Sequence, residues 1–462
     1  MTLPLHVVVL AAGKGTRMRS SRPKVLQPLA GRPLLAHCLD RVEALAPDGI
    51  SVVVSHQQER VRAAFADRAV AWVDQGVPGG TGHAVAVALG VDAIPDTARV
   101  LVTYADVPRI PVDDLRACVD SDYELAVLGA EVADPSGYGR LLLDASGSLT
   151  RIVEERHATP GERSIGTINT GVLAGRAGSL RRWLAACEPS PAAEREWYLT
   201  DVVERARADG VAVATVSSRQ PDAVLGVNDR AQLAEQERLL QRSQAHDLMR
   251  AGLELTDPER FDLRGHLEHG MDCRLDVNVI VEGHVTLGDE VQVGPGCVLR
   301  DCTIASGVEI AAHCVLEGVE VADGARIGPF ARLRPGTRVG PGARIGNFVE
   351  TKNAVLDAGA KVNHLSYVGD AHVGARANLG AGTITCNYDG ASKHHTEIGE
   401  EAFIGSNTAL VAPIAIGAGA TVGAGSTLSR DVDPAALALN RAPLRVVPEW
   451  TRPAKSAPKK ES

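Results

Sequence analysis

Aromatic side chains are scarce in this sequence, and long hydrophobic runs are absent. Phe, Trp and Tyr make up 3% of the 462 residues, whereas glycine occurs 47 times. This composition favours layers of small and β-branched residues over a large aromatic core. No apolar stretch approaches the roughly 18 residues that would cross a bilayer, so we expect no membrane insertion. The apolar residues 7–12 have no basic segment before them, so they do not predict a signal peptide.

An excess of positive charge and paired cysteines are also lacking. The net charge of −9 argues against broad electrostatic binding to nucleic acid or to an anionic membrane. The eight cysteines are scattered and form no Cys-x-x-Cys pair, so we expect free thiols in a reducing cytoplasm. With 45% apolar and 23% charged residues, the chain is close to the globular average, which excludes disorder as its main state.

The first half, residues 1–228, alternates short apolar runs with helical patterns. This alternation predicts an α/β domain with a largely parallel, Rossmann-like sheet, which binds ligands at the carboxyl ends of its strands. We expect strands at 5–10, 51–55, 100–103, 124–128 and 211–216, and helices at 34–45 and 82–89. In residues 229–255 a long linking helix is predicted, opened by a capping-box pair, Asp229 and Gln232. One face of this helix is marked by Leu233, Leu239, Leu240, Leu248, Met249 and Leu253.

From about residue 265 to 438 the apolar residues recur every six positions. Ile327, Leu333, Val339 and Ile345 follow this step. A hexapeptide period predicts a parallel β-helix in which three hexads close one coil, and we expect about nine or ten coils within residues 256–440. The period fails between Leu379 and Ile398, where residues 386–390 predict an extruded loop, a common place for function. Residues 441–462 are expected to form a solvated tail.

The first predicted strand runs into a turn that contains Gly13 and Gly15. Glycines let backbone N–H groups approach phosphate oxygens closely, and Arg17 and Lys24 offer charges to offset a triphosphate. The turn matches neither the Walker A motif nor the dinucleotide fingerprint, since Met18 stands at the third glycine position. Taken alone, such a turn is as often structural as functional.

Two oxygen-bearing side chains follow other strand-like runs. Asp106 comes after 100–103, and Asn228 comes after 223–227, which also resembles a strand. Either residue alone is as readily explained as a helix cap or a turn residue, but together they form a candidate Mg²⁺ site beside substrate phosphates. Gln75, followed by Gly80 and Thr81, offers amide and backbone groups for the edge of a base.

A second cluster of polar residues lies where the hexapeptide period lapses. Arg334 and Lys352 could grip a phosphate, and His364 could take a proton from an amine that attacks a thioester. Residues 15 to 20 positions apart lie above one another in stacked coils, which brings this cluster together. A single histidine in a β-helix is more often a packing residue, and only the cluster favours catalysis. The pair His394–His395 has no further ligand nearby, so we expect a solvated loop there.

These motifs resemble a known family. Residues 10–18 with Pro23 and Lys24 are similar to the phosphate-binding stretch of sugar nucleotidyltransferases. Together with the hexapeptide half, residues 5–452 resemble the bacterial family that fuses an N-acetylglucosamine-1-phosphate uridylyltransferase to a glucosamine-1-phosphate N-acetyltransferase. The resemblance implies a left-handed β-helix and the synthesis of UDP-N-acetylglucosamine for peptidoglycan and the cell envelope. It also implies UTP, acetyl-CoA, Mg²⁺ and a cytoplasmic homotrimer whose acetyl-transfer sites lie at subunit junctions.

The family's roles carry over to matching positions. The resemblance implies that Arg17 and Lys24 act in uridylyl transfer and that Asp106 and Asn228 hold Mg²⁺. The residues implied to bind the nucleotide and the sugar are Leu10, Ala11, Ala12, Gly13, Lys24, Gln75, Gly80, Thr81, Tyr104, Ala105, Asp106, Gly139, Glu154, Asn169 and Asn228. In the second half, His364 is the implied base. Arg334, Lys352, Tyr367 and Asn378 are implied to bind glucosamine 1-phosphate, and Ala381, Asn387, Tyr388, Ser406, Ala424 and Arg441 to line the acetyl-CoA site.

Two positions depart from the family pattern. Ala105 stands where the family usually has glycine, and Gly79 where it usually has leucine. We expect an extra methyl group beside the ligand and a looser wall near the base.

Three alternatives remain from the sequence. A nucleotidyltransferase with a purely structural β-helix would not need His364, Lys352 and Tyr367. A non-enzymatic assembly subunit would have no need of Lys24 and Asp106. Acyl transfer to a different amine is compatible with the same scaffold, because β-helix acyltransferases share a fold and differ in their sites.

Overall fold

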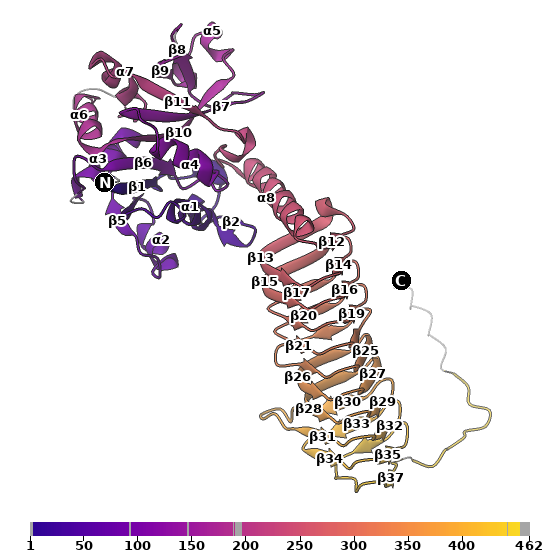
Figure 1. The fold of residues 1–462 in the computed structure, drawn as a ribbon. Helices are drawn as coiled ribbons and strands as arrows, with labels where there is room; N and C mark the ends of the chain where they lie inside the picture. Colours follow the sequence, from indigo (N-terminus) through magenta and orange to yellow (C-terminus); the bar gives the residue numbers. More distant parts are fainter. Residues whose placement is uncertain are drawn as a thin grey trace, which may run out of the picture. The chain divides into compact units, whose positions relative to one another are not determined.

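The computed structural model describes residues 3–91, 94–145, 147–187, 189, 196–440 and 442–452. It divides into two compact units, Met1–Gln244 and Ala245–Ser462 (Figure 1). The boundary falls within helix α8 (Arg230–Arg250).

The first unit is built on a nine-stranded sheet in the order β11-β7-β10-β6-β1-β4-β5, with β8 and β9 attached beside β10. Its strands are β1 (Leu5–Leu10), β4 (Gly49–Val54), β5 (Ala71–Asp74), β6 (Arg99–Tyr104), β7 (Leu125–Glu131), β8 (Arg140–Leu143), β9 (Leu149–Val153), β10 (Thr167–Arg176) and β11 (Val213–Ser217). The pairs β1–β4, β1–β6, β4–β5 and β7–β11 are parallel, whereas β10 is antiparallel to both β6 and β7. The predicted, largely parallel sheet is confirmed, with β10 as its inverted member.

Helices cover both faces of this sheet. They are α1 (Leu34–Glu43), α2 (Gln58–Ala64), α3 (Thr81–Val91), α4 (Val112–Val119), α6 (Ala177–Cys187) and α7 (Asp201–Ala208). The single-turn α5 (Pro160–Arg163) buries no residue. Strand β1 alternates between two cores: Val8 packs with residues of α3, α6 and α7, and Val7 packs with residues of α1 and α4. This period of two is what a strand buried on both faces requires.

One predicted strand is wrong. Residues 223–227 form no strand; instead the 3-10 turn η4 (Pro221–Ala223) leads into a loop. Within that loop the N–H of Val227 donates to the carbonyl of Asp106 at 2.9 Å. Proline has no N–H to give to a ladder, and a local apolar run cannot reveal that its partner is a loop rather than a strand.

Helix α8 confirms the helix predicted within residues 229–255. The N–H of Gln232 donates to Oδ1 of Asp229 at 2.9 Å, and Oε1 of Gln232 accepts from the N–H of Asn228 at 2.7 Å. In a capping box the Gln232 side chain would accept from the N–H of Asp229. Here it accepts from the N–H of Asn228, one residue earlier. The predicted apolar face is only partly correct, because Met249 is exposed and the buried positions include Gln236 and Gln241.

The second unit consists of short parallel strands stacked in coils (Figure 1). One sheet contains eleven strands: β12 (Glu254–Leu255), β14 (Arg274–Leu275), β16 (Gln292–Val293), β19 (Glu309–Ile310), β22 (Arg326–Ile327), β25 (Arg344–Asn347), β27 (Lys361–His364), β29 (Asn378–Leu379), β32 (Phe403–Ile404), β35 (Thr421–Val422) and β37 (Leu437–Ala438). One strand per coil gives eleven, slightly more than the nine or ten coils predicted.

The strands of the remaining faces form a fifteen-stranded sheet. They are β13 (Phe261–His269), β15 (Val279–Leu287), β17 (Val298–Arg300), β18 (Thr303–Ile304), β20 (Val315–Glu317), β21 (Glu320–Val321), β23 (Arg332–Leu333), β24 (Arg338–Val339), β26 (Glu350–Leu356), β28 (Tyr367–Val373), β30 (Ile384–Cys386), β31 (Thr396–Ile398), β33 (Ala409–Val411), β34 (Ile414–Ile416) and β36 (Thr427–Leu428). The hexapeptide positions point inward and form one continuous apolar core.

The predicted extruded loop is present between β30 and β31. Thr385 keeps the interior position, where its hydroxyl accepts from the N–H of Gly369 at 2.8 Å, whereas Ala391 is exposed. A bridge between Tyr388 and Lys393 folds the loop back on itself. At the other end of the unit's sequence, residues 442–452 of the predicted tail are exposed, and residues 453–462 lie outside the described part of the chain.

All eight cysteines are free thiols, as predicted. Among the described residues, none of the helices has the length and the apolar character needed to cross a membrane.

Candidate functional sites

A cavity of about 320 Å³ opens at the carboxyl ends of the central strands of the first unit. Parallel pairing places Leu10 of β1 beside Tyr104 of β6, so the residues that follow each strand meet at one edge. The cavity is lined by Leu10, Ala11, Ala12, Gly13, Lys24, Val25, Gln75, Pro78, Gly80, Thr81, Ala84, Tyr104, Asp106, Glu196 and Tyr198. Most of the expected nucleotide-binding residues are therefore brought together around one space.

Four of the expected charged and polar groups converge at Lys24. Its ammonium forms an ion pair with Asp106 and donates to Oδ1 of Asn228 at 3.0 Å. Arg17 donates to the same oxygen of Asn228 at 2.9 Å. Only 10% of the Lys24 side chain is exposed, so this charge is largely shielded from water. The arrangement places two cations and two oxygen ligands where a polyphosphate and its counterion would meet.

The expected base-binding residues form a second wall of the cavity. Nε2 of Gln75 donates to the carbonyl of Gly80 at 2.9 Å, and Oγ1 of Thr81 accepts from the N–H of Leu199 at 3.0 Å. Burial, together with the negative charges of Asp106 and Glu154, raises the pKa of Tyr104 well above its ordinary value. The phenol of Tyr104 therefore stays neutral at any physiological pH.

The expected sugar-binding residues do not line the cavity; Asn169 lies on β10, and Gly139 and Glu154 lie next to the ends of β8 and β9. The carbonyl of Gly139 accepts from the N–H of Asn169 at 2.7 Å. Glu154, directly after β9, accepts from the hydroxyl of Thr200 at 3.2 Å. Glu154 acts electrostatically on Tyr104, which connects this group to the cavity wall.

Ala105 and Gly79, the two departures from the family pattern, do not have the surroundings expected from the sequence. Ala105 is fully buried in the hydrophobic core and is not among the cavity-lining residues, so its methyl group is not beside the cavity. Space next to Gly79 is already occupied, because a Cβ there would lie 3.1 Å from Nδ1 of His83. The loose wall expected at Gly79 is filled by the histidine ring.

Glu196 and Tyr198 were missed by sequence reasoning. They come from the segment before α7 and complete the cavity wall. The guanidinium of Arg156 lies over the Tyr198 ring, 5.0 Å from its centroid. No strand-end position or glycine motif marks this segment, so nothing in the sequence pattern connects it with the phosphate-binding turn.

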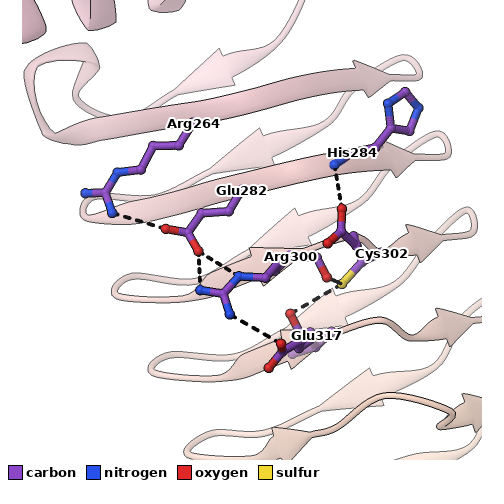
Figure 2. Close-up of polar contacts among 8 residues, drawn as sticks. Arg264, Glu282, His284, Arg300, Cys302 and Glu317 are labelled. Atoms are coloured by element: carbon purple, nitrogen blue, oxygen red, sulfur yellow. Dashed lines mark hydrogen bonds and ion pairs between the residues drawn. The ribbon is translucent and has the colours of Figure 1, made fainter. Parts of the chain in front are cut away.

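In the second unit, charged side chains form a column that crosses successive coils. Glu282 accepts from Arg264 at 3.1 Å and from Nε of Arg300 at 2.8 Å, and Arg300 reaches Glu317 at 3.3 Å (Figure 2). Alternating charges neutralise one another along these coils. Exposed ion pairs of this kind each add little to the stability of the fold. Their main effect here is that each of these four charged side chains has a partner of opposite charge.

The alternation ends at Arg334 and Lys352. The register places Arg334 after Glu317 and Lys352 directly after Arg334, so two cations are adjacent. Lys393 of the extruded loop and Arg334 together lower the pKa of Lys352, with Lys393 the larger cause. Although Arg334 has a partner in Glu350 at 2.9 Å, three cations remain gathered at one place, which makes a candidate phosphate site.

Lys393 was missed by sequence reasoning because it belongs to the loop that interrupts the hexapeptide period. In the sequence, Lys393 is notable only as the residue that precedes the pair His394–His395. The hairpin at Tyr388 returns Lys393 to the coil that carries Lys352. The sequence signal is a polar loop that is longer than the coil period. This signal marks the region, but it does not single out Lys393.

His364 is the last residue of β27, opposite Asn347 of the preceding coil. Its Nδ1 is 2.7 Å from Oδ1 of Asn347. An amide oxygen only accepts, so Nδ1 carries a hydrogen, and in the neutral form of the ring the lone pair is on Nε2. The same register continues along the column through Ala381, Ser406 and Ala424. The implied base and part of the implied acetyl-CoA site therefore follow one edge of the β-helix.

Other expected residues belong to different sheets of the β-helix. Lys352 and Tyr367 belong to the fifteen-stranded sheet, whereas Asn378 lies on the outward side of the eleven-stranded sheet, between Lys361 and Phe403. The extruded loop places a buried Asn387 against Asp370 and leaves Tyr388 largely exposed. Arg441 lies outside the described residues.

The histidine pair of the loop has carboxylate partners. His394 is 2.7 Å from Asp389, and His395 is 3.3 Å from Glu397. Within the described part of the chain, no group of three or more His, Cys, Asp or Glu side chains has the arrangement of a metal site.

Two family models match the chain. The MobA-like NTP transferase domain matches residues 7–169, and the six-repeat bacterial transferase hexapeptide matches residues 395–430. The class of protein is therefore a nucleotidyltransferase domain joined to a hexapeptide β-helix, in agreement with the two units of the fold.

Curated relatives match over almost the full length. A bifunctional protein GlmU from Alkalilimnicola ehrlichii is 52% identical over 98% of this chain and 97% of its own length. The proteins of the same name from Marinobacter nauticus and Xanthomonas axonopodis pv. citri are 49% and 50% identical; they match 98% and 99% of this chain and all of their own length. The chain belongs to the GlmU family of bifunctional uridylyltransferase–acetyltransferases.

Proposed function

We propose that this protein acetylates glucosamine 1-phosphate with acetyl-CoA and then transfers UMP from UTP to the resulting N-acetylglucosamine 1-phosphate, releasing pyrophosphate. Residues 1–228 carry uridylyl transfer, residues 229–255 link the domains, and residues 256–440 carry acetyl transfer. The observation that supports this assignment is the presence of two separate cationic centres, Lys24 with Arg17 in one unit and Lys352 with its neighbours in the other. Each lies where the family motif predicts a phosphate group.

Uridylyl transfer is an in-line displacement in this proposal. A phosphate oxygen of the sugar phosphate attacks the α-phosphorus of UTP, and pyrophosphate leaves from the opposite side. Lys24 and Arg17 neutralise the phosphate oxygens, while the backbone of the turn at Gly13 approaches them closely. Catalysis is mostly positioning, and no covalent enzyme intermediate is needed.

The oxygens of Asp106 and Asn228 fit a Mg²⁺ ion. Both already face one cation, the ammonium of Lys24. Mg²⁺ characteristically takes one or two protein oxygens and completes its coordination with water and substrate phosphates. When bound, the ion would supply charge neutralisation to the triphosphate. Asp106 and Asn228 would hold it, and Lys24 would turn toward the phosphates.

Acetyl transfer begins with the amine of glucosamine 1-phosphate attacking the thioester carbonyl of acetyl-CoA. The amine nitrogen forms a bond to the acetyl carbon, the carbon–sulfur bond breaks, and CoA leaves. His364 takes the amine proton on Nε2, since Nδ1 is held by Asn347. Arg334 and Lys352 hold the acceptor phosphate, and CoA lies along the column that contains Ala381, Ser406 and Ala424, with Asn387, Tyr388 and Arg441 completing its site.

A homotrimer is proposed because the residues implied to bind the acceptor come from different sheets of the chain. Lys352 and Asn378 belong to two sheets, and in this proposal a neighbouring copy brings the two kinds of residue together. The corner of the β-helix next to His364 supports a contact between copies. There Phe330 is 49% exposed and Phe348 is 55% exposed, and their rings stack with centroids 5.4 Å apart. Burying such rings between copies is favourable.

The cytoplasm is the compartment proposed for both reactions. Free thiols at all eight cysteines are suited to a reducing environment. The product, UDP-N-acetylglucosamine, is the expected precursor for peptidoglycan and the rest of the cell envelope.

The test mixes the purified protein with glucosamine 1-phosphate, acetyl-CoA, UTP and Mg²⁺, and follows free CoA thiol and pyrophosphate while each substrate is omitted in turn. CoA release without UTP, and pyrophosphate release only after acetyl-CoA is supplied, are the expected results. Pyrophosphate from supplied N-acetylglucosamine 1-phosphate, with no CoA release, would instead assign the β-helix a purely structural role.

A further inference from the structure

A segment far along the chain is hydrogen-bonded to the loop that precedes α3. The N–H of Trp197 donates to the carbonyl of Gly79 at 2.9 Å, and the carbonyl of Trp197 accepts from the N–H of Gly82 at 2.8 Å. The N–H of Leu199 donates to Oγ1 of Thr81 at 3.0 Å. These bonds fix the loop that provides Gly80 and Thr81 to the cavity wall.

The approach of Trp197 to this loop is so close that glycine is required. A Cβ at Gly80 would lie 2.5 Å from the carbonyl oxygen of Trp197, and the φ of Gly80 is +108°. A Cβ at Gly82 would lie 2.6 Å from Cδ1 of the indole. The absence of a Cβ at the two glycines on either side of Thr81 therefore makes room for Trp197 as well as for any ligand.

The indole supports the cavity wall from behind. It is 9% exposed and stacks on the ring of His83, with centroids 6.0 Å apart. Nδ1 of His83 lies 3.4 Å from Nε2 of Gln75, which also donates to the carbonyl of Gly80 at 2.9 Å. Contacts thus run from the indole through His83 to Gln75, a residue that lines the cavity.

We propose that Trp197 is a positioning residue that holds loop 75–82 in the conformation that receives the base of the nucleotide, and that it thereby sets the affinity for UTP. Its neighbours Glu196 and Tyr198 line the cavity, whereas Trp197 is not among the lining residues and contacts the loop instead. This inference rests on the proposed uridylyl transfer in this cavity.

Substitutions at Trp197 test this role. Its N–H is buried and has no acceptor among the described residues, so Trp197→Phe removes stacking area without breaking a hydrogen bond. Trp197→Ala removes the support for His83 altogether. Trp183→Phe is the control, because Trp183 is also buried but belongs to α6; its N–H donates to Asp209 at 2.9 Å, so this control is the more disruptive change.

The measurement is steady-state pyrophosphate release with UTP varied at saturating N-acetylglucosamine 1-phosphate, together with calorimetric binding of UTP. We expect Trp197→Ala to raise the KM and the Kd for UTP by about tenfold, with kcat changed by less than about twofold. Trp197→Phe should raise them by about threefold and Trp183→Phe should leave them unchanged. CoA release by the same preparations should be unaffected.

The outcomes separate this inference from the function on which it rests. Absence of pyrophosphate release by the unmodified protein would overturn the proposed function itself. Release by the unmodified protein with unchanged UTP affinity in both Trp197 variants would overturn only the positioning role. An equal loss of affinity in Trp183→Phe would also overturn it, because general destabilisation would then explain the effect. Should Trp197→Ala fail to fold, Trp197→Phe decides alone.

Discussion

At the scale of single residues, the first unit concentrates its chemistry on the contact between Lys24, Asp106 and Asn228. Lys24 opens the short 3-10 helix η2 (Lys24–Leu26), whereas Asp106 and Asn228 come from two other segments, and the ammonium of Lys24 contacts an oxygen of each. An electrostatic centre of this kind depends on charge more than on shape.

Asp106→Asn keeps the shape of the side chain but removes its charge. We expect pyrophosphate release to fall by about a hundredfold or more, because an amide binds a divalent cation and orients Lys24 far more weakly. Release of CoA should be unchanged. The two assays are run on the same preparation, and a parallel loss of both activities would contradict separate sites.

His364→Gln tests the assignment of the base in the second unit. Glutamine retains hydrogen-bonding capacity but cannot take a proton, so we expect CoA release to fall by about 10² to 10⁴-fold. Pyrophosphate release from supplied N-acetylglucosamine 1-phosphate should persist. His266→Gln, at an exposed histidine stacked on His284, provides the matched control. Full activity of His364→Gln would assign the base elsewhere.

At the scale of structural elements, the extruded loop changes the electrostatics of the coil to which it returns. Lys393 and Arg334 lower the pKa of Lys352, so Lys352 loses its proton at a lower pH than an isolated lysine. Binding of a phosphate by this group is complete well below that pKa and weakens as the pH rises through it.

Lys393→Met should therefore have two effects. The KM for glucosamine 1-phosphate should rise several-fold at neutral pH, because one cation is lost. The rise of KM at alkaline pH should move to higher pH, because the pKa of Lys352 returns toward its ordinary value. Measuring KM for glucosamine 1-phosphate between pH 7 and pH 10 tests both. An unchanged alkaline limb would show that the two lysines do not interact.

A bridging histidine joins three coils near the base of the same loop. His372 is 2.8 Å from Asp357 and 2.7 Å from Glu397, which also faces His395 at 3.3 Å. Burial alone would lower the pKa of His372, but the two carboxylates outweigh it and the net pKa is raised. Stability from this bridge is present below the ordinary histidine pKa and is lost as the pH rises through the raised value.

His372→Gln should accordingly lower the thermal midpoint of the protein at pH 6 and leave it nearly unchanged at pH 9. The loss should be less than about 1 kcal/mol, because the pair is partly exposed and screened. Thermal unfolding of the two proteins at both pH values is the measurement, with His266→Gln as control. A larger loss at the higher pH would reverse the assigned direction.

At the scale of the whole molecule, the separation of Asn378 from Lys352 predicts a site shared between copies. Sedimentation should show a trimer, and mixed trimers give a sharper test. Lys352→Met and Asn378→Ala are each expected to lack CoA release. After unfolding and refolding as an equal mixture, about a quarter of the shared sites should contain both native residues and recover activity. No recovery, with trimers formed, would place both residues of a site on one chain.

Much of the molecule follows from the sequence by itself, because the responsible interactions are periodic or local. The six-residue step of Ile327, Leu333 and Val339 determines the β-helix, since each position repeats the same burial in every coil. The turn at Gly13 and Asp106 could be recognised because each directly follows a strand, and parallel strands end at one edge.

Only the tertiary structure decided which distant residues meet. The run at 223–227 looks like a strand, but its Val227 bonds to a loop carbonyl. Trp197 reaches the loop at Gly80, and Lys393 reaches Lys352, through turns whose course depends on contacts formed elsewhere in the fold. Sequence patterns reveal which residues are buried at regular intervals along the chain. They do not record single contacts between segments far apart, because such contacts repeat nowhere and are fixed only when the whole core has packed.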